Sequence, residues 1–349
     1  MKRLRVAVIG FGVMGKHHAG VYAALPHTDL VAIVDPSAER RAEATQRFAV
    51  ATYLDVASLL RAETLEADPN TALGAARGTV LDAASVAAPT SRHCRITEQL
   101  LGAGVHVMVE KPVASSVPEA EKMAALSRER GLILQVGHIT RFYQAVELLG
   151  ERISEPYLIE ARRLTPNARI QDVGVILDLM IHDIDIVLGI VPHAIRSAHV
   201  SGHILSETGH EDVAAAQITF ENGCIARFLA SRVAPDAERT LVIAERKQTL
   251  RVDFGKEPHT EVSVYRPVAE GAGHAAGHSE IQMDRLIVHE DNPLRRELEH
   301  FLARIRRRTP PIGTLDDDLR ALQLATQLVT DLHVQIRAQS GLTRQVVPA

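Results

Sequence analysis

The chain has 349 residues, of which 46% are hydrophobic, and it carries a net charge of −4 and two cysteines. Single hydrophobic cores stop growing near about 250–300 residues, so this length predicts two domains. The small negative charge gives no general attraction to nucleic acid or an anionic membrane. Cys94 and Cys224 form no CxxC pattern, which excludes a disulfide framework and a cysteine zinc site, and we expect no metal. Because no stretch approaches the ~20 apolar residues that span a bilayer, we expect a cytoplasmic protein.

The first predicted element is a buried parallel strand at residues 4–9, followed at once by GFGVMG and then by a helix. Gly10, Gly12 and Gly15 have the GxGxxG spacing of a dinucleotide-binding turn. The first glycine permits a tight turn, the second lets a diphosphate approach the backbone, and the third lets the helix pack on the strand. The alternative is an ordinary strand–turn–helix without a nucleotide.

A second predicted strand, at residues 30–35, ends in Asp35. An acidic side chain about 20–25 residues after the first glycine accepts hydrogen bonds from ribose hydroxyls. Its charge would repel a 2′-phosphate, so we expect NAD as the cofactor. Arg40 and Arg41 keep NADP open as an alternative, because an arginine can accept that phosphate.

Helices and strands then alternate up to residue 138, with residues 63–79 read as a loop, and this order predicts a doubly wound parallel sheet. Ligands of such sheets bind beyond the carboxyl ends of the strands. The candidate cofactor-binding residues at those ends are Gly10, Phe11, Gly12, Val13, Met14, Gly15, Asp35, Arg40, Ala88, Pro89, Thr90, His93, Glu110 and Lys111.

Lys111 stands immediately before Pro112, at the end of the strand predicted for residues 105–110. Proline biases the residue before it towards extended geometry, so the direction of this lysine is fixed. Its place at a strand end predicts that the ammonium group points into the ligand crevice. The alternative is an ordinary surface lysine.

The second half alternates in the manner of strands, and Asn222-Gly223 between two such runs is a strong hairpin signal. We therefore predict an α/β fold with a Rossmann domain at residues 1–120. A second α/β domain with a mostly antiparallel sheet is predicted at residues 121–349.

Residues 175–188, VILDLMIHDIDIVL, are predicted to form a helix that is apolar nearly all round and therefore buried. Asp178 and His182 are four positions apart and share one face, which Asp185 could extend. We expect this pair to line a pocket. The alternatives are a surface Asp–His pair and a buried histidine satisfied by its neighbour.

These residue types suit the oxidation of an alcohol by hydride transfer. His182 would accept the hydroxyl proton, since an imidazole with a pKa near ~6.5 is an effective base at neutral pH. Asp178 would orient the imidazole, and the Lys111 ammonium would stabilise the developing alkoxide. Lys111, Asp178 and His182 are the candidate catalytic residues, on the condition that the two domains close on one another.

The motifs GFGVMG, AAPTSRH, VEKP and DxxxHxxD (Asp178, His182 and Asp185) resemble those of the Gfo/Idh/MocA family of NAD(P)-dependent sugar oxidoreductases. The resemblance implies a Rossmann domain followed by an α/β domain whose open, largely antiparallel sheet forms homodimers or homotetramers. It also implies that Lys111 and His182 are the catalytic pair, with Asp178 assisting.

Within the family, GHITRF and DVGVILDLMIHDID resemble the branch that oxidises the 3-hydroxyl of UDP-N-acetylglucosamine to a ketone. An aminotransferase can convert that ketone to a 3-amino sugar for lipid A. A nucleotide sugar brings a diphosphate, which guanidinium groups bind well. The candidate substrate-binding residues are Lys111, Arg141, Arg163, Arg169, Asp178 and His182. The alternatives are a dehydrogenase of a free sugar or inositol, and a non-catalytic NAD-binding sensor.

Overall fold

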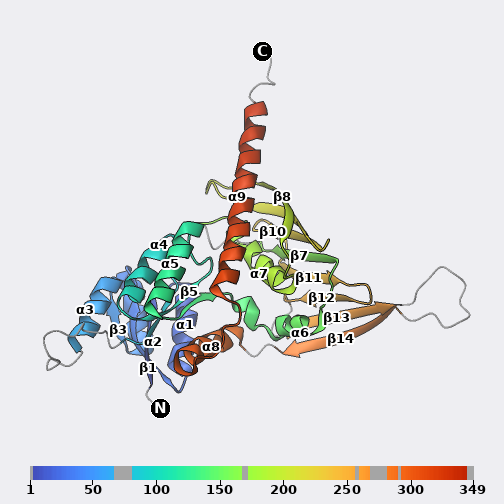
Figure 1. Ribbon diagram of the computed structural model, residues 1–349. Helices are drawn as coiled ribbons and strands as arrows, with labels where there is room; N and C mark the ends of the chain where they lie inside the picture. The colour runs from blue at the N-terminus through green and yellow to red at the C-terminus, as the bar shows by residue number, and fades with distance from the viewer. Residues whose placement is uncertain are drawn as a thin grey trace, which may run out of the picture. The chain divides into compact units, whose positions relative to one another are not determined.

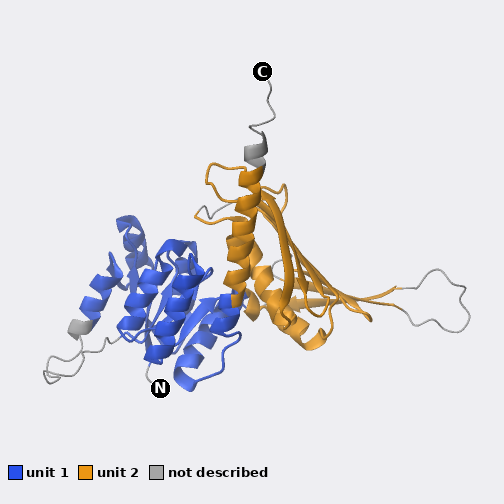
Figure 2. Cartoon of the chain, turned by 45° about the horizontal axis from the view of Figure 1, so that its top comes forward, with its two compact units in different colours: residues 1–139, 292–319 blue, residues 140–291, 320–349 orange. Residues whose placement is uncertain are grey.

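The computed structural model describes residues 3–66, 81–166, 172–255, 259–267, 281–289 and 292–343. The chain divides into two compact units (Figure 2). Unit 1 comprises residues 1–139 and 292–319, and unit 2 comprises residues 140–291 and 320–349. No helix in the described ranges has both the length and the apolar character needed to cross a membrane.

Unit 1 contains a six-stranded, all-parallel sheet in the order β3-β2-β1-β4-β5-β6. The strands are β1 (Leu4–Ile9), β2 (Thr28–Val34), β3 (Ala51–Tyr53), β4 (Ala83–Val86), β5 (His106–Glu110) and β6 (Leu134–Gly137). The strand order reverses between β1 and β4, which is the switch point where doubly wound sheets bind ligands. The predicted Rossmann architecture is confirmed.

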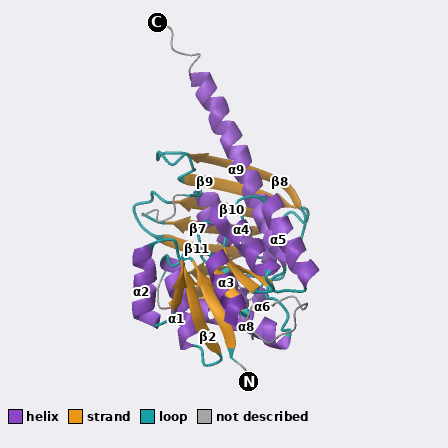
Figure 3. Ribbon diagram, turned by 90° about the vertical axis from the view of Figure 1, so that its left-hand side faces the viewer, coloured by secondary structure: helices purple, strands orange, loops and turns teal. Residues whose placement is uncertain are grey.

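Helices cover this sheet, and all but the last of them connect its strands (Figures 1 and 3). They are α1 (Val13–Ala24), α2 (Ala38–Phe48), α3 (Val56–Glu66), α4 (Thr90–Gly102), α5 (Val117–Arg130) and α8 (Pro293–Arg307). The region read as a loop from residue 63 begins instead as the last turn of α3. There the buried Glu63 accepts hydrogen bonds from Arg5 at 3.0 and 3.1 Å, which ties the helix end to β1.

The unit boundary differs from the one predicted near residue 120. Helix α5 and strand β6 belong to unit 1, because β6 pairs with β5 along its whole length. Helix α8, from late in the chain, also belongs to unit 1, where Leu298 and Phe301 share a core with Val6 and Tyr22. Hydrophobic patterning shows that α8 has an apolar face but not which sheet covers that face.

Unit 2 contains an eight-stranded sheet in the order β14-β13-β12-β11-β7-β10-β9-β8. The strands are β7 (Leu158–Leu164), β8 (Ile195–His203), β9 (Val213–Phe220), β10 (Ile225–Ser231), β11 (Glu238–Ala244), β12 (Thr249–Asp253), β13 (His259–Pro267) and β14 (Ile281–His289). Every neighbouring pair is antiparallel except β7 and β10. The hairpin predicted at Asn222-Gly223 joins β9 to β10, with Gly223 at a φ of +86°.

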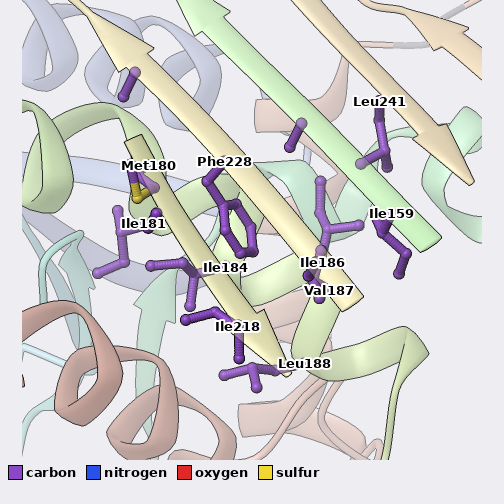
Figure 4. Close-up of a cluster of buried hydrophobic side chains, with 14 of the residues drawn as sticks. Ile159, Met180, Ile181, Ile184, Ile186, Val187, Leu188, Ile218, Phe228 and Leu241 are labelled. Atoms are coloured by element: carbon purple, nitrogen blue, oxygen red, sulfur yellow. The ribbon is translucent and has the colours of Figure 1, made fainter. Parts of the chain in front are cut away.

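The other helical segments among the described residues are η1 (Ile139–Phe142), α6 (Gln144–Arg152), the π-helical turn η2 (Ile176–Met180), α7 (Ile181–Ile190) and α9 (Leu315–Thr343). Helix α7 packs on the large sheet through Ile184, Val187 and Leu188 (Figure 4). Strand residues such as Phe228 and Leu241 belong to the same core. Most of residues 175–188 are therefore buried, as predicted, but their first turn is π-helical instead of α-helical.

Candidate active site

The three glycines of the first turn have different roles. Gly10 has a φ of +93°, and a Cβ there would lie 2.6 Å from the Ala87 carbonyl oxygen. A Cβ on Gly15 would lie 1.8 Å from the carbonyl oxygen of Gly10. A Cβ on Gly12 would meet no atom within 4 Å. Gly10 and Gly15 thus permit close packing, whereas Gly12, the N-cap of α1, leaves its backbone approachable by a diphosphate.

Asp35 follows β2 and lies beside this turn, with 2% of its surface exposed. Its carboxylate accepts hydrogen bonds from the backbone N–H groups of Phe11 and Ser37, both at 2.8 Å. The Arg40 guanidinium lies 3.6 Å from the same carboxylate, while Arg41 donates to the Asp35 carbonyl oxygen. A fixed acid next to an approachable glycine backbone fits the adenosine half of NAD.

The AAPTSRH segment ends β4 and begins α4, with Pro89 as the N-cap and Thr90 buried. His93 is 1% exposed. Its Nε2 lies 2.8 Å from the carbonyl oxygen of Ala88, and its Nδ1 lies 3.0 Å from that of Pro112. This histidine therefore joins the β4 end to the EKP turn inside unit 1, and its predicted contact with the cofactor remains a prediction.

Glu110 and Lys111 lie at the carboxyl end of β5, and the Lys111–Pro112 peptide is cis. Buried His18 of α1 places its Nε2 2.8 Å from Oε1 of Glu110. Burial alone would raise the pKa of Glu110, but the hydrogen bond and charge of His18, together with the Lys111 charge, bring this pKa below its ordinary value. The carboxylate also lies against Gly137, where a Cβ would come within 3.2 Å. Lys111 thus follows a charged residue that is anchored on two sides.

In unit 2, the four charged residues of η2 and α7 fall into two classes. Asp183 and Asp185 are buried, at 4% and 6% exposure, and each carboxylate is held by an arginine. Asp178 and His182 are half-buried. Two of the charges on this helix are therefore buried anchors, while Asp178 and His182 are the two that solvent partly reaches.

The two arginines that hold the helix were predicted to bind a diphosphate. Arg163 donates to Asp183 at 2.6 and 3.0 Å, and Arg141 donates to Asp185 at 2.5 and 2.9 Å. Burial alone would lower the pKa of Arg163, but the charge and hydrogen bond of Asp183 raise it, with a smaller contribution from Asp178. Each guanidinium group thus already binds a carboxylate along one edge. That carboxylate neutralises the positive charge with which the arginine would attract a phosphate.

Arg169, the third arginine expected to bind the substrate, lies outside the described residues. Sequence reasoning missed Glu211, Arg232 and Gly174, which surround the start of η2. Glu211 and Arg232 are buried, at 1% and 5% exposure. The burial of a charged side chain is the signal that distinguishes Glu211 and Arg232. That burial is visible only in the folded structure and not in the sequence.

Comparison with known proteins identifies the family. A family model described as "Oxidoreductase family, NAD-binding Rossmann fold" (Gfo/Idh/MocA) matches residues 4–138, and the Gfo/Idh/MocA C-terminal domain model matches residues 152–251. UDP-N-acetylglucosamine 3-dehydrogenase from Acidithiobacillus ferrooxidans is 32% identical over 89% of this chain and 91% of that protein. The chain belongs to the Gfo/Idh/MocA family. The predicted oxidoreductase class and NAD-binding fold are confirmed.

Further relatives from the family show how its members vary. A solved structure of the Acidithiobacillus ferrooxidans enzyme superposes with a TM-score of 0.82 at 30% identity, covering 96% of this chain and 99% of that one. A scyllo-inositol 2-dehydrogenase (NAD(+)) from Bacillus subtilis is 28% identical over 67% of this chain and 68% of its own length. The family therefore includes dehydrogenases of both nucleotide sugars and cyclitols.

Proposed function

We propose that this Gfo/Idh/MocA oxidoreductase is an NAD-dependent dehydrogenase that oxidises the 3-hydroxyl of UDP-N-acetylglucosamine to a ketone. The observation that carries the proposal is the division of charges on the helix of unit 2. Arginines hold the buried carboxylates of Asp183 and Asp185, while Asp178 and His182, four positions apart, are only half-buried. The nucleotide-sugar relative, which aligns along 89% of this chain, supports the choice of substrate.

In this proposal, His182 accepts the hydroxyl proton of the substrate and Asp178 stabilises the imidazolium that results. The Lys111 ammonium offsets the negative charge that develops on the substrate oxygen. NAD, when bound, accepts the hydride that leaves the substrate carbon. The turn at Gly10–Gly15 and the fixed carboxylate of Asp35 hold the dinucleotide.

The catalytic role of His182 is tested with His182→Asn, assayed with NAD and UDP-N-acetylglucosamine. We expect turnover to fall by about 100-fold or more, because removing a general base has effects of this size. NAD binding, measured by calorimetry, should be unchanged. His199→Asn, an exposed histidine on β8, is the matched control. Full activity in His182→Asn would contradict the assignment.

The substrate class is tested with a panel of UDP-sugars, free sugars and inositols, while the absorbance of the reduced cofactor is followed. We expect turnover with UDP-N-acetylglucosamine and competitive inhibition by UDP alone. The inositol dehydrogenase among the relatives makes a cyclitol the second candidate. Turnover of inositol without inhibition by UDP would favour this candidate, because a cyclitol site has no use for uridine.

The preference for NAD is attributed to Asp35, whose charge disfavours a 2′-phosphate near Arg40. Asp35→Ser should weaken NAD and improve NADP, measured as the ratio of kcat/KM for the two cofactors. An unchanged ratio would show that another residue selects the cofactor.

The proposal also covers the oligomeric state of the protein, the fate of its product and its compartment. We infer assembly into a homodimer or homotetramer through the large sheet of unit 2, which light scattering can test. The 3-ketone product is a substrate for an aminotransferase, and the resulting 3-amino sugar would serve lipid A synthesis. We place these steps in the cytoplasm, where fractionation should recover the protein.

A further inference from the structure

We infer that Glu211 is a positioning residue, whose buried carboxylate sets the start of the helix that carries Asp178 and His182. The inference deepens the proposed function, on which its catalytic part rests. Glu211 lies on the segment between β8 and β9, 33 residues after Asp178 in the sequence. None of the roles proposed above includes it.

Glu211 accepts two hydrogen bonds from the start of the helix. The backbone N–H of Val175 donates to the Glu211 carbonyl oxygen at 3.0 Å. The backbone N–H of Ile176 donates to the Glu211 carboxylate, also at 3.0 Å. The first N–H groups of a helix have no partner within the helix, so one residue satisfies two of them with its main chain and its side chain. A negative charge at this end also complements the helix dipole.

The Glu211 carboxylate also packs tightly against Gly174. A Cβ at Gly174 would lie 2.0 Å from the Glu211 carboxyl carbon and 2.1 Å from both oxygens. Real Cβ atoms essentially never come this close to another atom. The glycine thus provides the space in which the carboxylate lies, and any larger residue would displace one or the other.

A buried cation, Arg232, holds Glu211 itself in place. Arg232 donates through Nη2 to the carbonyl oxygens of Val173 and Glu211, both at 2.9 Å. Its Nε lies 3.2 Å from Oδ1 of Asp212. His333 on α9 places Nε2 3.6 Å from the other Glu211 oxygen. The strand connection and the chain entering the helix are therefore joined by one guanidinium group.

The consequence concerns geometry at the proposed base. Ile176, the residue held by the carboxylate, begins the π-helical turn that contains Asp178, and His182 lies in the first turn of α7. The Asp178 N–H also donates to the Gly174 carbonyl oxygen at 2.9 Å. Because misplacing a reacting group by about 1 Å can lower a rate by about 100-fold, a clamp two residues from Asp178 affects catalysis and not only folding.

The experiment compares Glu211→Asp with Glu211→Gln. Aspartate keeps the charge but is one methylene too short to reach the Ile176 N–H, whereas glutamine keeps both the reach and an acceptor oxygen. We expect Glu211→Asp to lower kcat for UDP-N-acetylglucosamine by about 10- to 100-fold with an unchanged KM for NAD. The kcat of Glu211→Gln should stay within about threefold of the wild-type value. Glu207→Ala, an exposed acid in the same connection, is the matched control and should leave kcat unchanged.

A second readout separates this inference from the proposed function. The imidazole NMR signal of His182, assigned with His182→Asn, should shift in Glu211→Asp and stay in place in Glu207→Ala. The positioning role alone would be overturned if the wild-type protein is active and Glu211→Asp shows both an unchanged kcat and an unshifted His182 signal. A wild-type protein that oxidises no UDP-sugar would overturn the proposed substrate, while the signal would still decide the role of Glu211.

Discussion

The glycine turn of unit 1 and the helix start of unit 2 solve one problem in different ways. Each brings a chain segment into a fixed position next to a proposed functional group. The turn does so with backbone geometry, since Gly10 and Gly15 leave no room for a Cβ. The helix start does so with hydrogen bonds from the buried side chains of Glu211 and Arg232, which lie far from it in the sequence.

This difference explains why the glycine turn can be predicted from the sequence and the helix start cannot. A glycine pattern is local, so six consecutive residues reveal it. Buried contacts of charged side chains join residues that lie far apart in the sequence, and in the sequence each of these residues looks like an ordinary surface charge. The two devices should also respond differently to mutation, because a lost anchor leaves a charge unpaired whereas an added methyl group introduces strain.

The largest effect is expected from Asp183→Ala. Its partner Arg163 has a side chain that is only 12% exposed. Removing the Asp183 carboxylate leaves this guanidinium without its ion-pair partner, and breaking a buried pair in this way destabilises proteins by about 3–5 kcal/mol. The free energy of unfolding from urea denaturation measures the loss. Glu221→Ala breaks the exposed pair with Arg196 and should lose less than about 1 kcal/mol. Equal losses would remove the distinction between anchoring and surface charges.

The next effect is expected from Gly15→Ala. The new Cβ meets the carbonyl oxygen of Gly10, a backbone atom that cannot swing away, so we expect a loss of about 1–3 kcal/mol from overpacking. NAD binding should be lost with it, because the turn itself must shift. Thermal unfolding and calorimetry with NAD give the two values.

Gly12→Ala sharpens the comparison within the same turn. Its Cβ has open space and its φ is −76°, so the change in stability should stay within about 0.5 kcal/mol. NAD affinity should nevertheless fall by about 10-fold or more, because the methyl group occupies the surface that the diphosphate approaches. Unchanged affinity would show that the cofactor does not use this glycine.

The smallest effect concerns the charged contact of unit 1, between His18 and Glu110. Because the pKa of Glu110 is lowered on folding, its contribution to stability is present above its ordinary pKa of 4.5. The contribution disappears as the pH falls below 4.5 towards the folded-state pKa, since the unfolded chain takes up the proton first. Glu110→Gln should therefore show a shallower loss of stability in acid than wild type, measured by urea denaturation from about pH 6 to 3. If the free energy of unfolding falls with pH equally in wild type and Glu110→Gln, the His18–Glu110 contact does not stabilise the fold.

Much of the fold was predictable, because parallel strands, connecting helices and the Asn222-Gly223 hairpin are encoded by local patterns. The placement of α8 was not, since an apolar helix face does not name its partner. At the site, the turn, Asp35 and the strand-end position of Lys111 followed from order along the chain. The pairing of Arg141 and Arg163 with aspartates did not, because a sequence shows charges but not which of them become neighbours.

The return of α8 to unit 1 has a consequence for how such proteins can be recombined. Unit 1 is built from two separate stretches of chain, residues 1–139 and 292–319. A fragment ending at residue 139 would lack Leu298 and Phe301, which belong to the same hydrophobic core as Val6 and Tyr22. Any graft of this cofactor domain onto another enzyme must therefore carry three junctions, after residue 139, before residue 292 and after residue 319, the last of them inside helix α9.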